Sequence, residues 1–238
     1  MIFFIIYDIL CIEDIMKSNL IIKRASYIFS VILIAALLLF ISAGTLNFWK
    51  AWFFIGLITI PTLVTIMYFS FSKSRILEIN IDFKGIFKAN LKKIIIFSII
   101  VVTGLIFAGI NLRFNWTQLP EWIVIQFSII FILAFALFII SCKEYKILSR
   151  HLFERRRKKL IDQGPYSIVR HPMYTALILI CLSVPVILGS IISLGIYSTI
   201  AIYLIIKIYT EEKNLKQELK DYNEYKERVK YKMIPYIW

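Results

Sequence analysis

The feature that most constrains this chain is a series of apolar runs, each about as long as a membrane-crossing helix. Four of them contain no charged residue and lie near 26–43, 51–71, 94–112 and 122–141. A helix needs about 20 residues to cross about 30 Å of hydrocarbon. Because 60% of the 238 residues are hydrophobic and 18% are charged, a soluble domain is excluded. The sequence predicts an all-α integral membrane protein.

The last apolar stretch, 172–206, is too long for one crossing at about 1.5 Å per residue. Pro185, Gly189 and Gly195 interrupt it, and these residue types break or bend helices. We therefore expect a tight hairpin of two shorter helices, at 173–188 and 191–206. The sequence predicts about six transmembrane helices in all, followed by a cytosolic C-terminal helix.

Basic residues are confined to alternate connections between these runs. Six Lys or Arg lie between the second and third runs, and nine lie between residues 143 and 170. The connections near Asn47, at 113–121 and at Gly189 carry almost none. The positive-inside rule then places both termini in the cytoplasm. Four tryptophans mark the expected outer boundary: Trp49, Trp52, Trp116 and Trp122.

This arrangement also explains the net charge of +13 better than nucleic-acid binding does, so no nucleic-acid partner is expected. We expect a single domain over 1–238, with a four-helix membrane part at 26–141 and the chemistry at 143–238. Residues 1–12 are apolar but too short to cross, and Met16 competes with Met1 as the start. The isolated cysteines, Cys11, Cys142 and Cys181, predict neither a zinc site nor a disulfide framework.

The first cluster of polar residues suited to binding or catalysis is 164–174. Gly164 and Pro165 predict a turn, and Pro172 suits the first position of a helix. The helix start presents backbone N–H groups beside Arg170 and His171, a combination that suits a carboxylate or a phosphate. Anchoring at the headgroup boundary explains the same residues equally well.

The second cluster is Lys207, Glu211 and Glu212. Lys207 and Glu211 are four residues apart and share one helix face. They form either an interfacial ion pair or the wall of a polar pocket, and spacing does not choose. The following stretch, 210–232, predicts one charged helix closed by Pro235, either solvated or acting as a lid. Its apolar residues are expected to pack against the helix ends: Tyr222, Tyr225, Val229 and Ile234.

Together these motifs resemble the isoprenylcysteine carboxyl methyltransferase family and its phospholipid-methylating relatives, over about residues 145–238. The matching residues are Gly164, Tyr166, Arg170, His171, Pro172 and Tyr174, then Glu211, Glu212 and Leu215, then Tyr222, Tyr225 and Pro235. The resemblance implies a membrane enzyme that uses S-adenosylmethionine at its cytosolic face, under the C-terminal segment. It also implies cofactor contacts from Leu160, Ile161, Tyr166, His171, Pro172, Met173, Tyr174, Glu211 and Glu212.

Arg170 and Lys207 are the residues we expect to act in catalysis. Lys207 stands where the family often has an arginine that faces the substrate, so the charge remains but the two-pronged grip on a carboxylate does not. A carboxylate, an amine, a thiol and a lipid headgroup all stay open as acceptors. The oligomeric state is not predicted.

The function predicted from the sequence is S-adenosylmethionine-dependent methyl transfer to a lipophilic acceptor, with membrane lipids as partners. One alternative is an NADPH-dependent reductase of the sterol reductase type, in which residues 155–159 would bind the 2′-phosphate. The other is a non-catalytic membrane protein or transporter, which the lack of charge in the first four helices disfavours.

Overall fold

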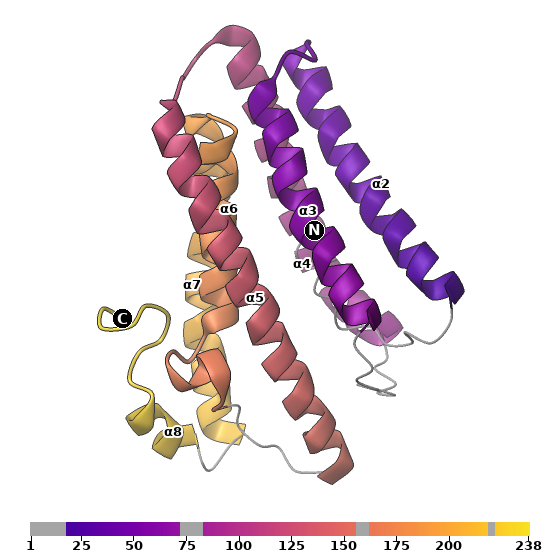
Figure 1. Cartoon of the computed structure of the whole chain (residues 1–238). Coiled ribbons are helices and arrows are strands. Elements are labelled where there is room, and N and C mark those ends of the chain that lie inside the picture. The colour runs from indigo at the N-terminus through magenta and orange to yellow at the C-terminus, as the bar shows by residue number, and fades with distance from the viewer. Residues whose placement is uncertain (1–17, 72–82, 156–161, 219–221) are drawn as a thin grey trace.

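The computed structural model describes residues 18–71, 83–155, 162–218 and 222–238. Within these ranges the chain forms α-helices and one 3₁₀ turn, with no strand (Figure 1). The elements are α2 (Ser18–Ala43), α3 (Trp49–Phe71), α4 (Phe83–Phe114), α5 (Glu121–Arg155), η1 (Gly164–Ser167), α6 (Pro172–Ile187), α7 (Ile191–Glu218) and α8 (Tyr222–Arg228). The prediction of an all-α fold is confirmed.

Each of the six predicted apolar segments lies in one of the helices α2 to α7. Among the described residues, three helical segments are long and apolar enough to cross a membrane: Leu91–Phe114, Glu121–Glu144 and Ile191–Gln217. Three shorter apolar helical segments accompany them: Ile28–Ala43, Trp49–Thr65 and Pro172–Ile187. These helices fit an integral membrane protein, while the number of complete crossings stays a prediction.

The predicted hairpin is confirmed at Gly189, which joins α6 to α7. Its φ of +80° lies in the region that glycine enters without strain. The N–H of Ser190 donates to the Pro185 carbonyl at 2.9 Å, which closes the turn. The expectation that Pro185 and Gly195 interrupt the segment is wrong, because α6 runs through Pro185 and α7 runs through Gly195. One glycine in a helix costs only about 1 kcal/mol.

The connections with few charges gather at one end of the bundle, at the top of Figure 1. There the side-chain amide of Asn111 donates to the Gly189 carbonyl at 3.2 Å, and the Thr117 hydroxyl donates to the same oxygen at 3.3 Å. The α4–α5 connection is thus tied to the tip of the hairpin. The four tryptophans at this end are all exposed, as expected for the boundary of a membrane.

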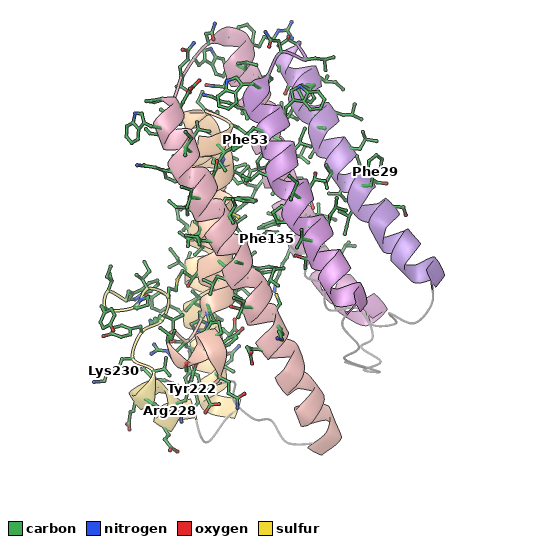
Figure 2. The ribbon with its side chains drawn as sticks, viewed as in Figure 1. Phe29, Phe53, Phe135, Tyr222, Arg228 and Lys230 are labelled. Atoms are coloured by element: carbon green, nitrogen blue, oxygen red, sulfur yellow. The ribbon has the colours of Figure 1, made fainter. Side chains whose placement is uncertain are left out.

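The apolar core runs through the whole bundle and contains residues from all six long helices. Figure 2 shows buried Phe135 in its middle and exposed Phe29 on its outer surface. Two glycines let helices approach closely, as is common in membrane bundles. A Cβ on Gly104 would lie 2.1 Å from the Tyr197 ring of α7, and one on Gly109 would lie 2.7 Å from the Leu39 carbonyl of α2.

The single charged helix predicted over 210–232 is wrong. Helix α7 continues to Glu218, α8 is short, and the chain after Arg228 runs back to the start of α6. An isolated parallel bridge joins Val169 to Tyr231. Helix α8 does not continue to 232, because the carbonyls of Tyr231 and Lys232 accept hydrogen bonds from the turn before α6.

Candidate functional site

The start of α6 and the C-terminal segment, residues 229–238, form one structural unit. The N–H groups of Arg170 and His171 donate to the carbonyls of Tyr231 and Lys232 at 3.0 and 2.9 Å. One turn into α6, the Thr175 hydroxyl donates to the Met233 carbonyl at 3.1 Å. These bonds fix the position of the segment that approaches the predicted cofactor residues.

A buried charge cluster centred on Glu212 locks this unit to α7. The Arg170 Nε donates to Glu212 Oε1 at 2.8 Å, and its Nη1 donates to the carbonyls of Val229 and Lys230 at 2.7 and 2.8 Å. The Lys232 Nζ lies 3.7 Å from Glu212 Oε2. The side chains of Arg170 and Glu212 are 3% and 9% exposed, so this ion pair is shielded from water.

His171 lies at the edge of the same cluster. Its Nε2 is 3.4 Å from Glu212 Oε1, but the alignment does not satisfy hydrogen-bond geometry, and this buried nitrogen has no other hydrogen-bond partner among the described residues. Its ring lies 5.7 Å from the Tyr174 ring. His171 therefore connects the Glu212 cluster to a second group of polar side chains.

The second group contains Glu211, Tyr174 and Lys207. The Tyr174 hydroxyl donates to Glu211 Oε2 at 2.5 Å, and the Lys207 Nζ lies 5.2 Å from the centre of the Tyr174 ring. Neighbouring residues on a helix point about 100° apart. The two glutamates therefore serve different groups: Glu212 faces the C-terminal segment, and Glu211 faces the first turn of α6.

The remaining predicted site residues are distributed around these groups. Pro172 is buried and Met173 is half-buried in the first turn of α6. Tyr166 is buried in η1, and its carbonyl accepts a 2.8 Å hydrogen bond from the Tyr225 hydroxyl. Leu160 and Ile161 lie outside the described residues, as do 156–159 of the basic stretch assigned to NADPH. The structure brings together the other nine predicted residues, and their contacts with a cofactor stay a prediction.

Helix α8 packs by means of two tyrosines that stay neutral. Tyr222 and Tyr225 are buried with Val229, which confirms the packing expected for these three, whereas Ile234 is 45% exposed and the expectation for it is wrong. Burial, with a smaller contribution from the Glu212 charge, raises the pKa of Tyr222 to about 12. Burial likewise raises the pKa of Tyr225.

Sequence reasoning missed Lys232. Its Nζ lies 4.0 Å from the centre of the Tyr209 ring and 5.3 Å from that of Trp238, in addition to its contact with Glu212. Charge–ring contacts of this kind are worth about 0.5–2 kcal/mol. The only sequence signal for Lys232 was the alternation of Lys230, Tyr231 and Lys232. That pattern does not reveal the partners of Lys232, because they come close only when the chain turns back on α6.

The first turn of α6 and the Glu211 carboxylate lie side by side and suit ligand groups of opposite charge. The side chain of His171, the N-cap residue, makes no capping hydrogen bond to α6, and Pro172 occupies the first turn of the helix. The helix start therefore suits an anion. The Glu211 carboxylate, oriented by Tyr174, suits a cation. The site therefore matches a small molecule that carries both charges.

Comparison with protein families supports this reading. Residues 124–221 match the model of the phospholipid methyltransferase family. The matched segment runs from α5 to the end of α7, and it contains the first turn of α6 together with Lys207, Glu211 and Glu212. No curated protein matches the chain. Residues 124–221 are thus similar to the phospholipid methyltransferase family, and this match confirms the family resemblance over that segment.

Proposed function

We propose that this protein is a membrane methyltransferase that uses S-adenosylmethionine and acts on a lipophilic acceptor. The observation that carries the proposal is the Tyr174–Glu211 hydrogen bond, which joins the first turn of α6 to α7 inside the family-matched segment. Both helices belong to the apolar bundle, which suits an acceptor dissolved in the membrane.

The chemistry of the two groups fits S-adenosylmethionine, which carries a carboxylate, an ammonium and a sulfonium. The helix start suits the carboxylate, and Glu211 suits the positive groups. Glu212 is less suited to this role, because Arg170 and Lys232 already balance its charge. When bound, the cofactor would supply an electrophilic methyl group.

The protein's contribution to such a transfer is alignment and exclusion of water. Tyr174 holds Glu211 in place, and the Glu212 cluster holds the C-terminal segment beside His171. Arg170 acts in this scheme by positioning that segment, since its guanidinium binds Glu212 and two backbone carbonyls.

Lys207 is the residue that we propose to bind the acceptor. It is half-buried near the C-terminal end of the apolar part of α7, beside the exposed side chains of Tyr203 and Ile206. A lysine there suits an acceptor with an anionic group at the end of an apolar chain. A carboxylate acceptor, with a free pKa of roughly 4, is already ionised and needs no general base.

The test is calorimetric titration of the protein in lipid nanodiscs with S-adenosylmethionine, and with NADPH as the competing ligand. Glu211→Gln should raise the Kd for S-adenosylmethionine at least about tenfold, as expected for losing one charge-assisted contact. Glu224→Gln is the matched control, because Glu224 is exposed on α8, and its Kd should equal that of the wild type. Binding of NADPH alone would refute the proposal.

The acceptor is then sought by incubating membranes with methyl-labelled S-adenosylmethionine and identifying the labelled product by mass. A labelled lipophilic product that the Lys207→Met variant makes more slowly, at unchanged cofactor Kd, supports the assignment of Lys207. Equal rates for the two proteins would remove Lys207 from the acceptor site.

A further inference from the structure

The C-terminal loop, residues 231–238, presents apolar side chains on its outside. Ile234, Tyr236 and Ile237 are 45%, 88% and 78% exposed. The loop leaves α8 and lies beside α6 and α7 (Figure 1), and the Trp238 and Tyr209 rings are 6.0 Å apart. Tyr209 is itself an exposed residue of the candidate span in α7. The loop therefore continues the apolar outer surface of the bundle.

The backbone of this loop is satisfied internally. The N–H groups of Lys232, Met233 and Ile234 all donate to a main-chain oxygen of Trp238, at 2.9, 3.0 and 3.1 Å. Those of Ile237 and Trp238 donate to the Ile234 carbonyl at 3.2 and 3.1 Å. Five of the six N–H groups of residues 232–238 are thus paired. In water an exposed loop does not need internal partners for its N–H groups, because water accepts their hydrogen bonds. In lipid each unpaired donor costs several kcal/mol.

The charge of the loop region suits a phospholipid surface. No acidic side chain occurs in 229–238, and Lys230 is exposed at the base of the loop (Figure 2). The rings of Tyr231 and Tyr236 are tilted against each other, with centres 5.3 Å apart. Tyrosine, tryptophan and lysine are the residues that favour the boundary between headgroups and hydrocarbon, and each lysine near an anionic surface contributes about 1 kcal/mol.

We infer that the tip formed by Ile234, Tyr236 and Ile237 inserts into the phospholipid leaflet at this end of the bundle. Lipid contact then anchors the segment that covers Arg170 and Glu212. This inference goes beyond methyl transfer and does not depend on it.

The experiment places a nitroxide label at the tip. Ile237→Cys is labelled in a background in which the three native cysteines are replaced by alanine, and the protein is reconstituted in bilayers of phosphatidylcholine and phosphatidylglycerol. Asn223→Cys, on the exposed face of α8, is the control. The ratio of collision rates with oxygen and with a water-soluble nickel complex should be at least threefold higher at 237 than at 223.

Equal ratios at the two positions would overturn the inference, as would dipolar broadening at 237, which indicates a second copy of the chain instead of lipid. A second measurement leaves the cysteines untouched. Tryptic cleavage at Lys230 in bilayers should be at least tenfold faster in Tyr236→Ser/Ile237→Ser than in the wild type. An unchanged cleavage rate would also overturn it.

Discussion

Replacing Glu212 with glutamine removes the charge at the centre of the buried cluster. Arg170 then keeps its bonds to the Val229 and Lys230 carbonyls but loses its ionic partner at 2.8 Å, and Lys232 loses its own at 3.7 Å. Breaking a buried ion pair costs about 3–5 kcal/mol. Because two carbonyl acceptors remain, we expect about 3 kcal/mol, which is about a 150-fold rise in the population with the C-terminal segment detached.

Limited trypsin digestion in nanodiscs measures that population. The side chains of Arg228 and Lys230 are already exposed, but the protease can bind the backbone around them only when the segment detaches. Cleavage of the Glu212→Gln variant should accelerate by about two orders of magnitude, while Glu224→Gln cleaves like the wild type. Combining Arg170→Met with Glu212→Leu removes both charges and should recover part of the protection. Wild-type cleavage rates in Glu212→Gln would refute the argument that this cluster holds the segment.

Three further outcomes are expected. Gly104→Ala forces a methyl group against the buried Tyr197 ring and should destabilise the protein by about 1–3 kcal/mol in thermal unfolding, whereas Gly56→Ala, with no atom within 4 Å of the added Cβ, should not destabilise it. The raised pKa of Tyr222 means that its neutral form stabilises the folded state fully below pH 10, a contribution lost as pH rises from 10 to about 12. Subtracting the tyrosinate titration of Tyr222→Phe from that of the wild type should leave one transition near pH 12. A transition near pH 10 would contradict the burial argument. Lys207→Met should lower kcat at unchanged Kd for S-adenosylmethionine, and a change in that Kd alone would contradict its role.

The helices and the hairpin could be predicted because each depends on local sequence. Apolar runs of helical length and the turn residue Gly189 specify α6 and α7 without knowledge of any partner. The error at Gly195 arose because a glycine with open space around it is tolerated in a long helix. The C-terminal segment defeated prediction because its path depends on pairing with Val169, more than 60 residues earlier.

The candidate site was predictable as a set of residues but not as an arrangement. Motif spacing identified Glu211 and Glu212 together. Only the packing of α7 against α6 decides that the first meets Tyr174 and the second meets Arg170. The contribution of Lys232 could not be foreseen, since it requires the reversal of the chain after α8.

The bonds from Asn111 and Thr117 to the Gly189 carbonyl have a mechanical consequence. They fix the turn between α6 and α7 at the end of the bundle remote from Glu211. Any tilt of α7 relative to α6 therefore takes place about this turn. Glu211 lies 22 residues beyond Gly189, about 33 Å at 1.5 Å per residue. A tilt of α7 relative to α6 by about 5° about this turn would shift the Glu211 end by about 3 Å. That shift is enough to break the bond between Glu211 and Tyr174 while the Gly189 end of the bundle stays in place.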